Sequence, residues 1–154
     1  MTDAERPPGA PPAAVPQLVV VDDDPGVRLV LGRALARFGY EVFLAEGGAE
    51  ALAHLDNQPD IVAVLTDIDM SPVSGIELTR HILSRRPGLP ILYITGNPTA
   101  AADLAPGRVD VLTKPVDIAR LGEAVDSLVR RTRGTAHEAA GTGYAADSGP
   151  GRTG

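Results

Sequence analysis

The sequence contains no cysteine, and this absence removes several kinds of chemistry at once. The chain cannot form a disulfide, use a thiolate nucleophile or hold a metal ion through cysteine. No run reaches the roughly 18 apolar residues that a membrane-spanning helix needs. The first residues also lack the basic and then apolar pattern of a secretory signal. We therefore expect a cytoplasmic protein that does not enter a membrane.

Acidic residues outnumber basic ones, and lysine is almost absent. The formal net charge is -6, which argues against a nucleic-acid partner. Lys114 is the only lysine among the 14 basic residues, the others being arginine. An ammonium is a compact point charge, whereas a guanidinium is a wide planar fork. Lys114 lies between a predicted strand and Pro115, and this position makes it a candidate functional residue.

Composition divides the 154 residues into three parts. Residues 1–16 are rich in proline and alanine without any periodic pattern, so we expect a disordered arm. Residues 17–133 have the apolar patterns of one globular domain. Residues 134–154 are rich in small residues, and we expect a disordered tail there.

Short apolar runs alternate with helical patterns throughout residues 17–133. Each run of β-prone residues is followed by a segment in which apolar side chains recur every three or four positions. This alternation predicts an α/β fold with a parallel sheet and helices on both faces. The predicted strands are 18–21, 41–45, 61–66, 91–95 and 109–113. Helices are predicted between them, with only one or two turns in 96–106, and a last helix ends at Arg133.

Polar side chains follow four of the predicted strands, at the point where each apolar run ends. Asp22 and Asp23 follow the first strand, and Asp67 follows the third. Thr95 ends the fourth strand, and Lys114 follows the fifth. A single aspartate after a strand is most often a turn residue. Because the carboxyl ends of parallel strands share one edge, we expect these groups to converge on one cleft.

The chemistry open to this group is narrow. Crowded carboxylates repel one another unless a cation joins them. Mg²⁺ prefers oxygen ligands, and the lack of nearby histidine or cysteine disfavours zinc. A carboxylate such as Asp67 can attack phosphorus and form an aspartyl phosphate. Lys114 and the hydroxyl of Thr95 can stabilise charge on the transferred oxygens.

Four motifs give the chain a specific resemblance. Over roughly residues 17–131 it resembles the receiver domain of a two-component response regulator. The motifs occur in the family's order: Val21-Asp22-Asp23-Asp24-Pro25, Asp67-Ile68-Asp69-Met70 with Gly75, Ile94-Thr95-Gly96 and Thr113-Lys114-Pro115. The resemblance implies a flavodoxin-like, doubly wound sheet of five parallel strands in the order 2-1-3-4-5.

The resemblance also implies roles for residues and partners. A histidine kinase or histidine phosphotransfer protein would transfer a phosphoryl group onto Asp67. The receiver itself would catalyse both this phosphorylation and the later dephosphorylation. Thr95 and Lys114 would contact the phosphoryl oxygens, and Lys114-Pro115 would be a cis peptide. The Mg²⁺ ligands would be Asp22, Asp23, Asp67 and the backbone carbonyl of Asp69.

The chain departs from the family pattern in places that concern output. Ser71 stands where proline usually follows methionine, and Asp69 adds a negative charge that we expect to alter phosphoryl build-up or hydrolysis. Val111 replaces an aromatic residue that commonly moves inward on phosphorylation. The segment between Thr95 and Lys114 is about one helical turn short, so we expect a shortened fourth helix. These features resemble receivers attached to hybrid kinases and their stand-alone relatives.

The function predicted from the sequence is therefore that of a single-domain response regulator. No output domain is recognisable outside the receiver pattern, so we expect it to signal through a downstream protein partner or a phosphorelay, as a monomer or weak dimer. One alternative is an interaction module that keeps the receiver fold without using phosphorylation. A haloacid-dehalogenase-like phosphatase is disfavoured, because its nucleophile comes first in the chain and its acidic pair follows the lysine.

Overall fold

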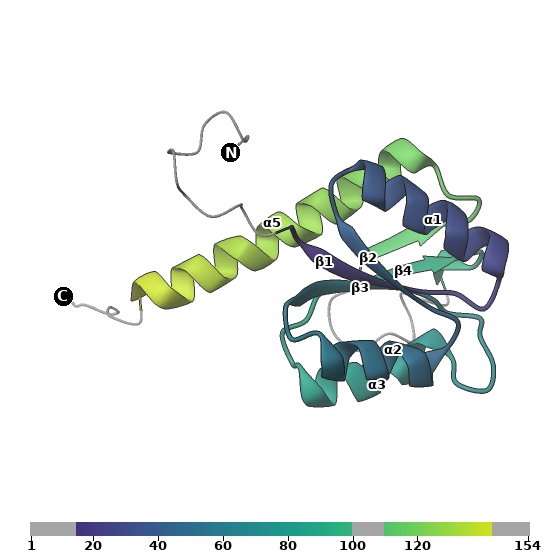
Figure 1. The fold of residues 1–154 in the computed structure, drawn as a ribbon, viewed down its shortest axis with the longest axis horizontal. Coiled ribbons are helices and arrows are strands. Elements are labelled where there is room, and N and C mark those ends of the chain that lie inside the picture. Colours follow the sequence, from purple (N-terminus) through teal and green to yellow (C-terminus); the bar gives the residue numbers. More distant parts are fainter. Residues whose placement is uncertain (1–14, 100–109, 143–154) are drawn as a thin grey trace.

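The computed structural model describes the backbone of residues 15–99 and 110–142, and side chains as far as Arg131. Five parallel strands form one sheet in the order β2-β1-β3-β4-β5, as the resemblance to receiver domains implies. The strands are β1 (Gln17–Val21), β2 (Glu41–Ala45), β3 (Ile61–Asp67), β4 (Ile91–Thr95) and β5 (Asp110–Thr113). The helices are α1 (Pro25–Arg37), α2 (Gly48–Asn57), α3 (Gly75–Arg85) and α5 (Ile118–Thr142). Helices α1 and α5 cover one face of the sheet, and α2 and α3 cover the other (Figure 1).

The central strand β1 shows how the two faces are built. Successive side chains of a strand point to opposite faces. Leu18 and Val20 are buried in the apolar cluster against α1 and α5, whereas Val19 and Val21 are buried in the cluster against α2 and α3. A strand buried on both faces is a continuous apolar run rather than an alternating one. This burial is the reason for the uninterrupted sequence Leu-Val-Val-Val.

Local signals set the start and the end of α1. The side chain of Asp24 accepts hydrogen bonds from the backbone amides of Gly26 at 2.8 Å and Val27 at 3.2 Å. Pro25 occupies the first turn, where its missing N–H is not needed. After α1, Gly39 has φ of +99°, a left-handed conformation that favours glycine. The helix therefore begins next to the end of β1 and keeps the Asp22–Asp24 turn short.

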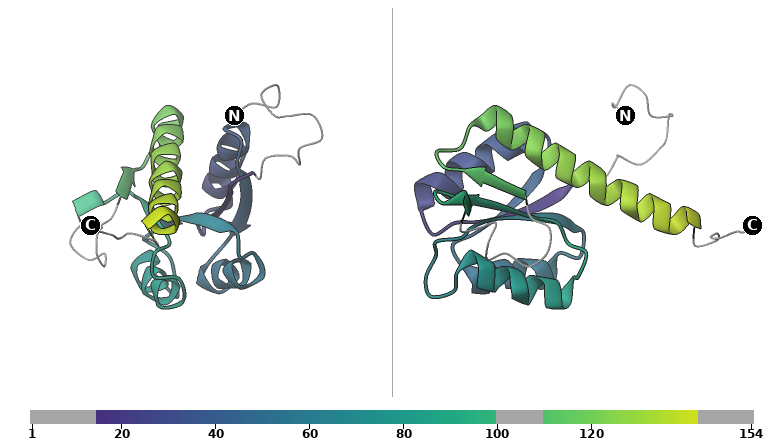
Figure 2. Two further views of the ribbon diagram at one scale, coloured as in Figure 1. Left: turned by 90° about the vertical axis from the view of Figure 1, so that its left-hand side faces the viewer. Right: turned by 180° about the vertical axis from the view of Figure 1, so that it is seen from behind.

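The register of the sheet brings the ends of four strands to one edge. Val21 of β1 pairs with Thr66 of β3, and Asp67 of β3 pairs with Ile94 of β4. Thr95 of β4 then pairs with Thr113 of β5. The residues that follow these strands are consequently neighbours in space, whatever their separation in the chain. Figure 2 shows the sheet between its two helical layers in two further orientations.

The last helix is longer than the sequence predicts. Helix α5 extends to Thr142, so the prediction that it ends at Arg133 and that residues 134–154 form a disordered tail is wrong for 134–142. Alanine is frequent in this stretch and favours helix strongly enough to continue it past Gly134. The expected short fourth helix falls mainly on residues 100–109, outside the described residues, as do 1–14 of the predicted arm and 143–154 of the tail.

None of the helices in residues 15–99 and 110–142 has the length and apolar character needed to cross a membrane.

Arg86, just after α3, links three segments at the edge of the sheet opposite Asp67. Its guanidinium donates hydrogen bonds to the backbone carbonyls of Ile61 at 3.3 Å, Gln58 at 3.1 Å, and Leu55. These carbonyls lie at the end of α2 and the start of β3. The neighbouring Arg85 instead pairs with Asp56 at the surface, where both side chains are exposed.

Replacing Arg86 by alanine should therefore destabilise the fold far more than replacing Arg85. We expect R86A to lower the free energy of unfolding by roughly 2 kcal/mol, because hydrogen bonds from a charged donor to three carbonyls are lost. R85A should change it by less than about 1 kcal/mol, since exposed ion pairs contribute little. Urea denaturation of the two variants measures both values. Equal losses would contradict the role assigned to Arg86.

Candidate functional site

Three aspartates gather at the carboxyl edge of the sheet. Asp22 and Asp23 follow β1, and Asp67 ends β3. One carboxylate oxygen from each lies within 4.8 Å of the other two. The side chains of Asp22 and Asp67 are buried, with exposures of 1% and 5%, and Asp23 is exposed to solvent. The sequence predicted this cluster, and the structure brings its members together.

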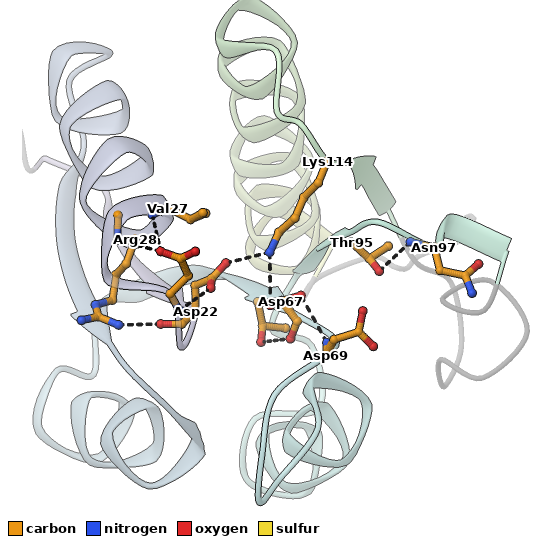
Figure 3. A network of polar contacts seen from close by, with 11 residues as sticks. Asp22, Val27, Arg28, Asp67, Asp69, Thr95, Asn97 and Lys114 are labelled. Atoms are coloured by element: carbon orange, nitrogen blue, oxygen red, sulfur yellow. Dashed lines mark hydrogen bonds and ion pairs between the residues drawn. The ribbon is translucent and has the colours of Figure 1, made fainter.

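Lys114 lies between the two buried carboxylates. Its Nζ is 3.2 Å from Asp22 Oδ2 and 3.2 Å from Asp67 Oδ2 (Figure 3). The lysine comes from the loop between β5 and α5, and its backbone amide donates to the Thr95 carbonyl at 2.9 Å. This backbone bond holds the end of β5 beside the end of β4. A single ammonium thus offsets the negative charge of two carboxylates whose residues are far apart in the chain.

The protonation states of Asp67 and Lys114 follow from their surroundings. Burial raises the pKa of the Asp67 carboxyl above its usual 3.8, and the charge of Asp22 raises it further. Contacts with Lys114 lower it without cancelling the rise. Burial lowers the pKa of Lys114, but its hydrogen bonds and charge interactions with Asp22 and Asp67 outweigh burial and raise it overall. The ammonium is therefore held charged between the carboxylates.

Thr95 lies at the same edge, but its hydroxyl faces another partner. The side chain is buried at the end of β4. Its Oγ1 accepts a hydrogen bond from the backbone amide of Asn97 at 3.0 Å. Figure 3 shows this contact directed away from the Asp67–Lys114 pair. The structure therefore places Thr95 next to the cluster without joining it to the ion pairs.

Asp69 is close to Asp67 through its backbone rather than its side chain. Its amide donates to Asp67 Oδ1 at 3.2 Å, and its carboxylate is exposed. The side chain borders a cavity of about 670 Å³ that also contacts Asp23, Ser71 and Arg80. The backbone carbonyl of Asp69 as a metal ligand stays a prediction from the resemblance.

Two peptide bonds near the site are cis. Lys114-Pro115 is cis, which confirms the expectation from the resemblance. Ser71-Pro72 is also cis, at the position where the chain departs from the usual loop pattern.

Gly75 is required where the loop after Asp67 enters α3. A Cβ at this position would lie 2.1 Å from the backbone oxygen of Asp67 and 2.9 Å from the Ile68 Cα. The amide of Gly75 donates to the Ile68 carbonyl at 2.9 Å. Only glycine permits this close approach of the helix start to the backbone of the aspartate.

Two residues at the site were missed by sequence reasoning. Arg28 of α1 donates from Nη1 to the backbone carbonyl of Asp22 at 2.7 Å. Thr66 of β3 donates from its hydroxyl to the backbone carbonyl of Asp67 at 2.9 Å. The signal for Thr66 was present, since it is a polar residue within an apolar strand. Arg28 gave no signal that separates it from a solvent-facing arginine on a helix.

The donor set suits a hard divalent cation. It consists of carboxylate oxygens, two of them on buried side chains, and the described residues bring no histidine or cysteine to the cluster. Magnesium is bound through one or two carboxylates together with water and substrate oxygens. Asp22, Asp23 and Asp67 therefore fit such an ion by their chemistry and by their mutual separation.

Comparison with known proteins identifies the family. Residues 18–126 match the family model described as response regulator receiver domain. The chain therefore belongs to the receiver domain family of response regulators. It is 36% identical to a solved response regulator receiver protein from Pseudomonas putida, with a TM-score of 0.68, over 75% of this chain and 98% of that one. A receiver protein from Sinorhizobium medicae gives a TM-score of 0.71 at 27% identity, over 77% and 97% of the two chains.

Curated relatives are longer proteins. The chain is 37% identical over 118 residues to the transcriptional regulatory protein GlrR of Escherichia coli K12, covering 75% of this chain and 26% of GlrR. It is 39% identical over 120 residues to the response regulator MprA of a Mycobacterium species, covering 75% of this chain and 51% of MprA. The chain thus spans about a quarter to a half of the length of these relatives.

The raised pKa of Asp67 predicts how stability depends on pH. Between pH 3.8 and its raised pKa, the Asp67 carboxyl binds more protons in the folded protein than in the unfolded chain, so its contribution to the free energy of unfolding falls as the pH rises through this range. In EDTA, D67N should therefore be more stable than the wild type at pH 7, and the difference should shrink as the pH falls towards 3.8.

Urea denaturation across this pH range, without divalent cations, measures the difference. D69N serves as the control, because it removes an exposed carboxylate from the same loop and should change stability by less than about 0.5 kcal/mol. A D67N variant that is less stable than the wild type at pH 7 would show that Lys114 outweighs burial at this carboxylate.

Proposed function

We propose that the protein is a cytoplasmic phosphoacceptor of a two-component pathway and that Asp67 is the residue phosphorylated. The observation that carries this proposal is the position of its carboxylate. It is buried at the end of β3, close to two further carboxylates and 3.2 Å from the only lysine of the chain. Membership of the receiver domain family supports the same role.

The geometry is suited to in-line transfer onto a carboxylate oxygen. An oxygen of Asp67 forms a bond to phosphorus while the bond from phosphorus to the imidazole nitrogen of a phosphohistidine breaks, and the electron pair stays with that nitrogen. The backbone amide of Asp69, which donates to Oδ1, helps to orient the carboxylate. Lys114 is placed to offset negative charge on the transferred oxygens. Hydrolysis of the product by water restores Asp67.

Magnesium would be held by Asp22, Asp23 and Asp67, together with the carbonyl of Asp69. When bound, it supplies positive charge for the transferred oxygens and for the carboxylates. The protein's own positive charge at the two buried carboxylates comes from Lys114, which is 3.2 Å from each of them. Thr95 is proposed to contact a phosphoryl oxygen by turning its hydroxyl from the Asn97 amide towards Asp67.

A surface beside Lys114 suits a protein partner. An apolar groove of about 660 Å³ is bordered by Val27, Val30, Lys114, Pro115 and Ile118 among other residues. Val30 and Ile118 are 56% and 39% exposed. Because the groove adjoins the phosphorylation site, it is the proposed contact for the histidine kinase or phosphotransfer protein. Output would be a change of affinity for a downstream protein, or onward transfer of the phosphoryl group.

A small phosphodonor tests the acceptor directly. In acetyl phosphate and Mg²⁺, we expect the intact protein to gain one phosphoryl group, measured by mass spectrometry. EDTA should abolish the gain, and so should D67N. D60N is the matched control, since it makes the same change on an exposed residue before β3 and should leave the gain intact.

The alternative function, an interaction module that does not use phosphorylation, predicts a different result. In that case the wild type gains no phosphoryl group and shows no Mg²⁺-dependent binding of beryllofluoride, although it folds normally. Modification that persists in D67N would instead place the acceptor on another residue.

The exposed carboxylate of Asp69 should influence how long the phosphoryl group remains. Its amide contacts Asp67, so its negative charge lies next to the site of hydrolysis. We expect D69N to change the rate constant for loss of the phosphoryl group by at least about twofold, as a nearby charge acts on a charged reacting centre. The measurement is the decay of phosphorylated protein after acetyl phosphate is removed. A lifetime equal to that of the wild type would refute this role.

A further inference from the structure

Thr66 has an unusual place in the strand that carries Asp67. Its side chain is fully buried, and it follows the apolar residues Val64 and Leu65. A buried hydroxyl lowers stability unless it makes a hydrogen bond. Here Oγ1 donates to the backbone carbonyl of Asp67, the next residue, at 2.9 Å. The hydroxyl therefore acts on the peptide group of the proposed acceptor itself.

The Asp67 carbonyl is also confined by the start of α3. Gly75 approaches it so closely that a Cβ would lie 2.1 Å from the oxygen. The Gly75 amide donates to the carbonyl of Ile68 at 2.9 Å. The peptide group between Asp67 and Ile68 thus accepts a hydrogen bond from the Thr66 hydroxyl, and the next one, between Ile68 and Asp69, accepts a hydrogen bond from the backbone at the start of α3.

We infer that Thr66 is a positioning residue for phosphoryl transfer, an inference that rests on the function proposed above. Its hydroxyl fixes the peptide group that follows Asp67. The next peptide group along the chain carries the amide of Asp69, and that amide donates to Asp67 Oδ1 at 3.2 Å. Thr66 thereby sets the direction of the carboxylate towards Lys114 without touching the transferred group.

Thr79 is a second buried hydroxyl in the same region, and its hydrogen bond lies within one helix. It is as deeply buried as Thr66, with 1% exposure. Its Oγ1 donates to the carbonyl of Gly75, four residues earlier in α3, at 2.8 Å. Threonine in a helix commonly makes this local bond. Because the bond does not involve Asp67, Thr79 provides a matched comparison for Thr66.

Three variants separate positioning from simple burial. T66V keeps the shape of the side chain and removes the hydroxyl, T66S keeps the hydroxyl, and T79V makes the same change as T66V at the comparison site. We expect T66V to slow phosphorylation by acetyl phosphate about three- to tenfold at saturating Mg²⁺, as one well-formed hydrogen bond is lost. T66S and T79V should stay within about twofold of the wild type. Urea denaturation of each variant shows whether it is folded.

A second measurement does not depend on phosphorylation. The carbonyl ¹³C resonance of Asp67, recorded by NMR in EDTA, should shift in T66V and remain in place in T79V. If the wild type gains no phosphoryl group, the proposed function fails, and this resonance still decides whether Thr66 holds the carbonyl. The inference is overturned if T66V reacts at the wild-type rate, if T66S is slowed as much as T66V, or if the resonance does not move.

Discussion

The site depends on one balance of charge, in which the ammonium of Lys114 lies 3.2 Å from the carboxylates of both Asp22 and Asp67. Two buried carboxylates this close would repel strongly, and removal from water disfavours their charged forms further. A compact ammonium can lie between two oxygens from different strands, whereas a guanidinium would need a wider, planar arrangement. The fold makes this contact possible, because the parallel sheet brings the ends of β1, β3 and β5 to one edge.

Around this contact, side chains donate hydrogen bonds to the backbone carbonyls of the two buried aspartates. Arg28 bonds to the carbonyl of Asp22, and Thr66 bonds to the carbonyl of Asp67. Gly75 closes the far end of the loop against the same aspartate. The residues between, including Asp69 and Ser71, face solvent beside a cavity. A phosphoryl group on Asp67 would therefore lie beside a solvent-exposed loop.

Much of the fold and of the site could be predicted, because both have local signals in the sequence. Apolar runs that end in polar residues located the strands and their functional edge, and Asp24-Pro25 located the start of α1. The end of α5 was predicted wrongly, since the small residues after Arg133 were expected to be disordered and the helix continues through them to Thr142. The direction of the Thr95 hydroxyl and the bond from Arg28 had no local signal, as each depends on a partner placed by the folded backbone.

The sequence by itself determined which chemical groups are available and at which strand ends they lie. Strand periodicity and the polar residue after each apolar run are properties of short segments, so they can be recognised without knowing the fold. Tertiary structure decided which of these groups touch. Lys114 is 92 positions from Asp22, and only the sheet register and the turn after β5 bring their side chains to 3.2 Å. The raised pKa of Asp67 has the same origin, because burial and neighbouring charge exist only once the strands have assembled.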